Sequence, residues 1–284
     1  MLEDKASATA QSVALHRAAH QLLDRPAVFS DPLALRIIGR EAETALREGA
    51  ANHILTGAAG LRAFLTVRSR FAEDCLAEAI DRGVGQYVLL GAGLDTFAYR
   101  GTYDPARLRV FEIDHPATQE WKRRRLGDAD IAVPGSVHFV PADLERETAA
   151  EGLARAGFDR AAPALFALLG VLTYLTQEAA MEILRFAARQ PGVSSEIIFD
   201  YPEPADAIGP AQRRAMQRLA ARVAAVGEPF QTAFKPDEIK EILLALGFSH
   251  IEDMDTAALN ARYCQGRDDA FALRGSAHIM HAWR

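Results

Sequence analysis

The stretch that decides the fold is VLLGAGLDT at residues 88–96, followed at residues 110–114 by VFEID. A glycine-rich turn that leaves an apolar strand lets a ligand lie against the backbone, because Gly91 and Gly93 have no Cβ. An acid at the end of the next strand, about 20 residues on, is placed to accept hydrogen bonds from ribose hydroxyls. Asp114 lies 21 residues after Gly93. Together these features predict an adenosine-containing ligand at the carboxyl ends of the strands.

Outward from this stretch, short apolar runs alternate with helical segments. Strands are expected at 86–90, 108–113, 137–140, 164–169 and 196–199, with helices at 116–127, 145–156, 176–190, 204–226 and 236–246 and two late β-like segments at 248–254 and 276–283. Apolar strands separated by helices are typical of a parallel sheet covered on both faces. The predicted fold class is therefore α/β, with a Rossmann-like, mostly parallel sheet of about seven strands.

The residues before the first strand read as helices, at 6–25, after Asp31-Pro32, and at 58–82. No Gly/Ser-rich linker divides the chain, so we expect one domain over 1–284. Within it, 1–82 is predicted to form a helical cap that covers the substrate, and 83–284 the core. The helix at 204–226 is expected to act as a lid.

Composition excludes several classes of protein. The chain has 284 residues, 49% of them hydrophobic, and a net charge of −6, which disfavours a general nucleic-acid binder. The longest apolar run is about half of the roughly 20 residues that a membrane span needs. With no secretory leader and two distant cysteines, Cys75 and Cys264, a cytoplasmic protein is expected. Its partner is expected to be a small molecule, and its oligomeric state is left open.

Two groups of residues are weighed as decoys. His16 and His20 have the i, i+4 spacing of a zinc pair, but no third ligand follows nearby, so no metal is predicted. The basic run KRRR at 122–125 is interpreted as a solvated helix face.

The identity of the ligand depends on the glycine turn. A dinucleotide fingerprint, G-x-G-x-x-G, would need a third glycine where Thr96 stands. Asp95 would repel a phosphate and suits a cationic group, such as the sulfonium or amino group of S-adenosylmethionine. We therefore expect S-adenosylmethionine as cofactor. An NAD-dependent oxidoreductase, a non-catalytic S-adenosylmethionine-binding protein and a tight turn without ligand are the alternatives.

The chain resembles the leucine carboxyl methyltransferase family, a class I S-adenosylmethionine-dependent group with bacterial polyketide O-methyltransferase-like members. The resemblance covers nearly the whole chain and is carried by LLGAGLDTFAYR, FEIDHPATQEWKRRRL, FVPADLE, LLGVLTYL and GEPFQTAFKPDEIKEILLALGF. The segments SATAQSVALHRAAH and RYCQGRDDAFALRGSAHIMHAW resemble it too.

The resemblance implies roles for individual residues. Arg68 corresponds to the arginine that pairs with the carboxylate of the methionine moiety, and Asp114 to the acid that binds ribose. Gly91, Gly93 and Asp95 belong to the turn beneath the cofactor, and Asp143-Leu144 to the pair that contacts adenine. Leu169 stands where the eukaryotic protein-carboxyl methyltransferases of the family carry a glutamate. That departure favours a small-molecule substrate.

The expected activity is O-methylation of a carboxylate or hydroxyl. A carboxylate needs no base, whereas a phenol with a pKa near 10 would benefit from one, and no dedicated base is evident. Tyr99, Arg100, Tyr174 and Tyr201, at or just past strand ends, are candidates for the substrate side. For Arg100 an internal pair with Asp95 is the preferred interpretation.

Overall fold

The computed structural model describes residues 6–49, 59–190, 195–267 and 269–284. They form a seven-stranded sheet in the order β3-β2-β1-β4-β5-β7-β6, in which β7 runs in the opposite direction to the other six strands. The strands are β1 (Gln86–Leu90), β2 (Arg109–Asp114), β3 (Val137–Pro141), β4 (Ala164–Leu168), β5 (Ser195–Pro202), β6 (His250–Met254) and β7 (Ala277–Trp283). The predicted fold class is confirmed, including the late pair of strands.

Helices cover both faces of the sheet. One face carries α5 (Ala59–Asp81), α6 (Pro116–Asp128) and α11 (Thr256–Tyr263), and the other carries α7 (Ala149–Arg155), α8 (Gln177–Ala188) and α10 (Pro236–Ala245). Strand β1 shows why two layers form. Its side chains alternate, so that Tyr87 and Leu89 pack in one hydrophobic cluster and Val88 and Leu90 in the other.

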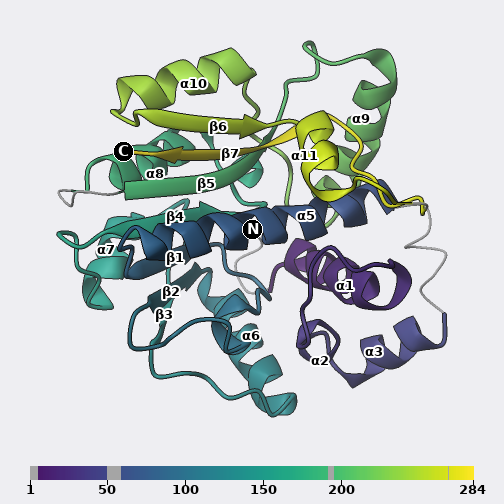
Figure 1. Ribbon diagram of the computed structural model, residues 1–284, viewed down its shortest axis with the longest axis horizontal. Helices are drawn as coiled ribbons and strands as arrows, with labels where there is room; N and C mark the ends of the chain where they lie inside the picture. The colour runs from purple at the N-terminus through teal and green to yellow at the C-terminus, as the bar shows by residue number, and fades with distance from the viewer. Residues whose placement is uncertain (1–5, 50–58, 191–194, 268) are drawn as a thin grey trace.

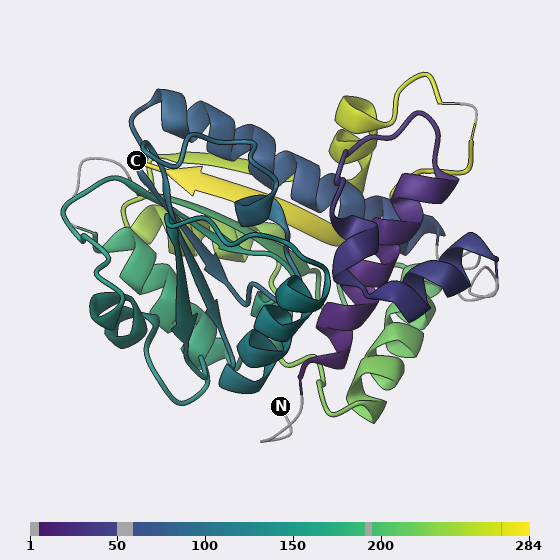
Figure 2. The same cartoon turned by 90° about the horizontal axis from the view of Figure 1, so that it is seen from below.

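The helices before β1 differ in where they pack, and the division of the chain into cap and core stays a prediction. In Figure 1, α5 crosses in front of the sheet, and its Phe71, Cys75 and Leu76 are buried in the same cluster as Leu165 of β4. The preceding helices are α1 (Ala8–Leu23), α2 (Ala34–Ile37) and α3 (Arg40–Arg47). Figure 2 shows them gathered at one end of the molecule, near α9 (Pro210–Ala225). Residues 1–5 and 50–58 of the predicted cap lie outside the described residues.

Several elements differ in length from the expectation, among them β5 and α9. Strand β5 runs on to Pro202, beyond the predicted end at 199, because β7 pairs with it as far as Ala277. Helix α9 starts at Pro210 rather than at 204, and Pro210 occupies the first helical turn, where proline is tolerated. Among the described helices, none has the length and hydropathy required to cross a membrane.

Candidate active site

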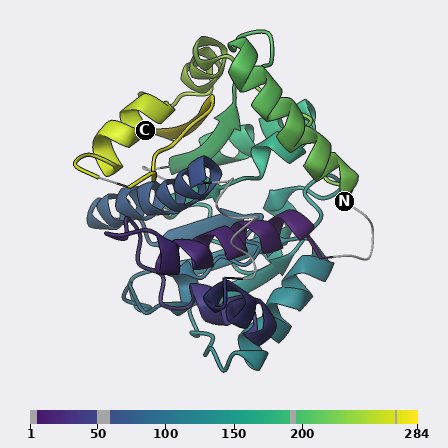
Figure 3. The same ribbon diagram turned by 90° about the vertical axis from the view of Figure 1, so that its right-hand side faces the viewer.

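A cavity of about 980 Å³ opens at the carboxyl ends of the parallel strands. Its floor, as the term is used below, consists of Gly91, Gly93, Asp114, Gly170 and Asp200, which lie at or near the carboxyl ends of β1, β2, β4 and β5. Its roof consists of α9 and the loop at 227–231. Helices α1 and α5, which lie side by side in Figure 3, form the wall between floor and roof. This edge is where open α/β sheets bind ligands.

The glycine turn of the floor has no room for side chains. Gly91 has φ +67°, and a Cβ added there would lie 2.4 Å from Cγ2 of Val171. Gly93 has φ +46°, and its Cβ would lie 3.1 Å from the Cβ of Ala10 on α1. Both positions therefore require glycine for conformation and for space. The backbone of this turn is open to a ligand, as the motif predicts.

Asp114 faces the cavity from the end of β2. Its carboxylate accepts hydrogen bonds from the backbone N–H groups of Gly93, at 2.6 Å, and of His115, at 2.7 Å. Burial raises the pKa of Asp114, while these two hydrogen bonds work against the shift. The carboxylate is thus fixed in position beside the glycine turn.

Asp95 lies in the turn but is already paired with Arg17 of α1. The Arg17 Nη1 lies 3.2 Å from Asp95 Oδ2, and the same guanidinium binds Asp31 and the Thr96 hydroxyl. Burial alone would raise the pKa of Asp95, but Arg17 holds it below its ordinary value. This corrects the charge argument made from sequence, because the turn does not present an uncompensated carboxylate to a cation.

Arg68 lines the cavity from α5 and is held by the floor. Its Nη1 donates to Oδ2 of Asp200 at 2.8 Å, and Asp200 also accepts from the backbone N–H of Gly170. The Arg68 Nε is buried and has no hydrogen-bond partner among the described residues. A Cβ on Gly170 would lie 2.6 Å from the guanidinium. Arg68 therefore has donor capacity left for an anionic ligand group.

Three further residues predicted to contact the cofactor also line the cavity: Asp143, Leu144 and Leu169. Asp143 accepts a hydrogen bond from the backbone N–H of Glu145 at 3.1 Å, which orients its carboxylate after β3. The structure brings all eight predicted cofactor residues to one cavity. Their individual roles stay predictions.

The four substrate-side candidates divide into two pairs, of which Tyr174 and Tyr201 line the cavity. Tyr174 packs against Phe230 at a ring distance of 5.4 Å, and burial raises its pKa to about 12. The Tyr201 hydroxyl donates to Asp253 at 3.1 Å. Both phenols are therefore neutral at ordinary pH, and Tyr201 is held by the protein itself.

Tyr99 and Arg100 are not among the residues that line the cavity, so the structure gives no support to their assignment to the substrate side. Tyr99 is the last residue of a 3₁₀ turn, η1 (Phe97–Tyr99), and Arg100 follows it as the C-cap. The Tyr99 hydroxyl donates to Glu112 at 2.7 Å. Because Arg17 occupies Asp95, Arg100 pairs with Glu73 of α5 rather than with Asp95.

Sequence reasoning missed Asp200 and Arg17. Asp200 ends the apolar run EIIFD at 196–200, which has the same form as VFEID at 110–114, so the signal was present. The sequence around Arg17 gave no such signal, because the partners of Arg17 lie 14, 78 and 79 residues away in the chain.

The predicted solvated face at 122–125 also needs correction. Lys122 of α6 is buried, and its Nζ lies 2.7 Å from Glu112 of β2. This cation therefore lies between α6 and the sheet and not on a solvated face.

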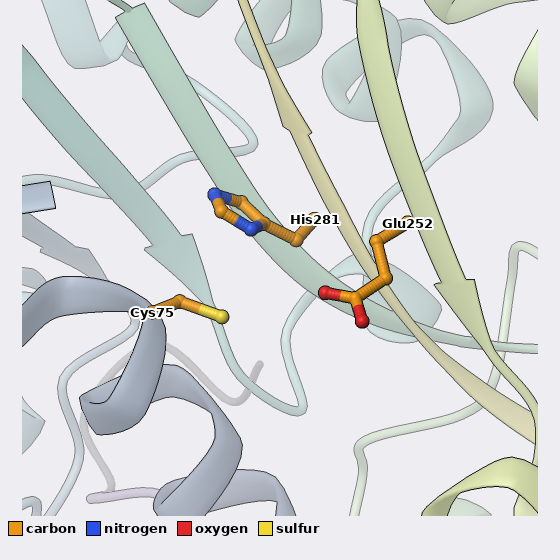
Figure 4. Close-up of side chains that lie close together, drawn as sticks. All are labelled: Cys75, Glu252 and His281. Atoms are coloured by element: carbon orange, nitrogen blue, oxygen red, sulfur yellow. The ribbon is translucent and has the colours of Figure 1, made fainter. Parts of the chain in front are cut away.

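In both groups of possible metal ligands, some side chains already have hydrogen-bond or ion-pair partners in the protein. His20 is buried, with its Nδ1 2.9 Å from Asp24, and its other ring nitrogen accepts from backbone N–H groups. Cys75, Glu252 and His281 gather between α5 and the sheet (Figure 4). However, His281 lies 2.9 Å from Glu196, and Glu252 is paired with an arginine of α11. The absence of a metal stays a prediction.

Comparison with known proteins gives consistent results. Residues 10–188 match the family described as leucine carboxyl methyltransferase. A candidate S-adenosyl-L-methionine-dependent methyltransferase of Bacillus subtilis is 31% identical, over 99% of both chains. One from Mycobacterium tuberculosis is 33% identical, over 61% of this chain and 51% of its own.

Solved structures show the same fold. A DUF574 family protein from Streptomyces avermitilis superposes with a TM-score of 0.61 at 16% identity, covering 99% of this chain and 98% of its own. A candidate methyltransferase from Thermobifida fusca gives a TM-score of 0.56 at 19% identity, covering 92% and 98%.

Proposed function

This chain belongs to the leucine carboxyl methyltransferase family and is an S-adenosylmethionine-dependent methyltransferase; on that premise, we propose that it methylates an oxygen atom of a small organic molecule. The acceptor oxygen belongs to a carboxylate or a hydroxyl group. Family membership sets aside the NAD-dependent alternative. The observation that carries the small-molecule proposal is Leu169, an apolar residue that lines the cavity at the position where protein-carboxyl enzymes of the family have an acid.

The residues present fit the cofactor. Gly91 and Gly93 leave the backbone bare, and the carboxylate of Asp114 is fixed beside them, where ribose hydroxyls would donate to it. The unpartnered Nε of Arg68 is suited to the carboxylate of the methionine moiety. Asp143 and Leu144 are assigned to adenine.

When bound, the cofactor supplies a methyl group on a cationic sulfur. Transfer to an acceptor would form an O–CH₃ bond from an oxygen lone pair and break the C–S bond, whose electron pair would go to sulfur. The chain's residues hold the two reactants in line and exclude water. His115, which lines the cavity, accepts from the N–H of Ala117 and caps α6, and Tyr174 keeps its proton. These residues give no general base, which favours an acceptor oxygen that is already ionised.

We further propose that the enzyme acts in the cytoplasm and binds neither nucleic acid nor membranes. The net charge of −6 and the two free cysteines, Cys75 and Cys264, support this.

The test is a transfer assay with a deuterated methyl donor and a panel of organic acids and phenols. The expected product carries one labelled methyl group on oxygen. Mild alkali distinguishes the two acceptor groups, because it hydrolyses a methyl ester and leaves an aryl ether intact. A label found on nitrogen, sulfur or carbon would contradict the proposal. Tight binding of S-adenosylhomocysteine with no turnover of any acceptor would favour the non-catalytic alternative.

A further inference from the structure

The inner face of α9 is only partly covered by the described part of the chain. Ala215, Met216, Leu219 and Val223 recur at helical spacing and line the cavity. No residue of α9 is buried, and within the part of the chain that the structure describes neither hydrophobic cluster includes one. An apolar helix face that borders a cavity is suited to an apolar ligand.

The acidic and the basic side chains that line the cavity differ in their partners. Its carboxylates each accept hydrogen bonds from protein donors: Asp95, Asp114, Asp143, Glu145, Asp200 and Glu228. Arg17 and Arg68 are paired with acids. Arg222 and Arg274 also line the cavity, but across residues 6–49, 59–190, 195–267 and 269–284 neither has a carboxylate within ion-pair distance. Arg222 and Arg274 are therefore cations at the cavity that have no ion-pair partner among the described residues.

Of these two arginines, Arg222 continues the apolar face of α9. It lies three residues after Leu219 and directly before Val223, and it is exposed, so it lies where the cavity meets solvent. His16 of α1 is a near neighbour. Burial, followed by the charges of Arg62 and Arg222, lowers the pKa of His16 to about 4, so the Arg222 guanidinium lies near this end of the wall.

Resting on the proposed function, we propose that the methyl acceptor is an amphipathic anion. Its apolar body packs between Met216 and Leu219 of α9 and Phe64 of α5, which lines the cavity from the wall. Its anionic group pairs with Arg222, whose guanidinium offers several donors to a carboxylate. Arg222 is thus a specificity-determining residue that acts on the acceptor and not on the cofactor.

The test measures ligand binding by calorimetry with protein saturated in S-adenosylhomocysteine. Three probes separate the two parts of the proposal: decanoate has the apolar body and the charge, 1-decanol has the body alone, and acetate has the charge alone. Decanoate is expected to bind at least tenfold more tightly than either of the others. Equal affinity for decanoate and decanol, or no binding of decanoate, would overturn the proposal.

Arg222→Gln is compared with Arg218→Gln, which makes the same charge change one turn earlier, on an exposed residue that does not line the cavity. R222Q is expected to weaken decanoate about tenfold and to leave decanol unchanged, whereas R218Q alters neither. Equal losses in both variants would point to the general charge of α9 and contradict a specific site. A loss in Arg274→Gln but not in R222Q would also contradict it.

Binding of S-adenosylhomocysteine by R222Q is measured first. Unchanged affinity for it is expected, and a loss would make Arg222 a cofactor residue and overturn the inference. If the wild-type chain does not bind S-adenosylhomocysteine, the proposed function fails. If it does bind and decanoate shows no dependence on Arg222, only the inference fails.

Discussion

The floor and the roof of the cavity are built in different ways. The floor consists of strand ends whose polar groups are buried and tied to one another, such as Asp114 to the N–H of Gly93 and Asp200 to Arg68. The roof helix α9 has no buried residue and is held near its ends. Gln212 donates to the carbonyl of Gly275, and beyond the other end Glu228 accepts from Ser7, Ala8 and Thr9.

This difference suits the floor and the roof to different ligands. A ligand common to many enzymes can be bound by residues that the sheet itself fixes. A substrate that varies can be bound by a helix whose side chains are under few packing constraints, so that they can change at little cost in stability. The comparison can be tested by substitutions in each part.

The largest effect is expected for Gly91→Ala in the floor. The new Cβ would meet Val171 at 2.4 Å in a backbone conformation with φ +67°. Overpacking and left-handed strain together should lower the free energy of unfolding by about 2–5 kcal/mol, measured by urea denaturation. Gly83→Ala is the control, because Gly83 also has positive φ but no atom lies within 4 Å of its Cβ. Equal losses of unfolding free energy in both variants would mean that the left-handed backbone conformation, and not the contact with Val171, causes the effect.

Asp114→Ala should weaken binding of S-adenosylhomocysteine at least tenfold. The variant removes charge-assisted hydrogen bonds, each worth about 1.5–3 kcal/mol. Isothermal titration calorimetry gives the dissociation constant. Asp104→Ala on a surface turn makes the same change in charge away from the cavity. An unchanged affinity in the Asp114 variant would remove that residue from the cofactor site.

Stability at acidic pH should depend on His16, in the wall. Its pKa is lowered by burial and by Arg62 and Arg222 to about 4, so between about pH 6.5 and 4 the unfolded chain binds the proton more readily. Stability contributed by neutral His16 is therefore lost as pH falls from 6.5 towards 4. Between pH 7.5 and 5 the loss amounts to about 2 kcal/mol.

His16→Gln should remove that part of the pH dependence, measured by urea denaturation at both pH values. His250→Gln, on an exposed residue of β6, is the matched control. The same pH dependence in wild type and in both variants would refute the role of His16.

The smallest effect is expected in the roof. Leu219→Ala should change the free energy of unfolding by no more than about 0.5 kcal/mol, because Leu219 packs on no described core cluster. The same substitution in the floor-side strand, Leu90→Ala, should cost about 2–5 kcal/mol, because Leu90 is 1% exposed. Comparable losses at both positions would erase the distinction between roof and floor.

The sequence was informative where structure is local. The strand, turn and acid of VLLGAGLDT and VFEID lie within 27 residues of chain, and the order of strands and helices followed from alternating patterns. It was not informative where partners are distant. The pairing of Arg17 with Asp95, 78 residues apart, withdraws the charge that had favoured a cationic ligand. Lys122 is a different case: its partner Glu112 is near in sequence, but the basic run alone does not show that this lysine turns inward to it.

The roof illustrates the same limit. A lid helix was predicted at 204–226, but its sequence does not show which face it turns inward, because that depends on where its two ends are held. The contacts of Gln212 and Glu228 fix this orientation, and both join segments far apart in the chain. The inner position of Arg222 therefore became visible only in the structure.

The position of β7 has a consequence for shortened chains. β7 lies between β5 and β6, although it follows β6 in the chain. A chain cut before residue 277 would therefore lose the strand that joins β6 to the sheet, and β5 would become an exposed edge. An exposed strand edge is prone to aggregation, so such a chain should be less soluble than the full one.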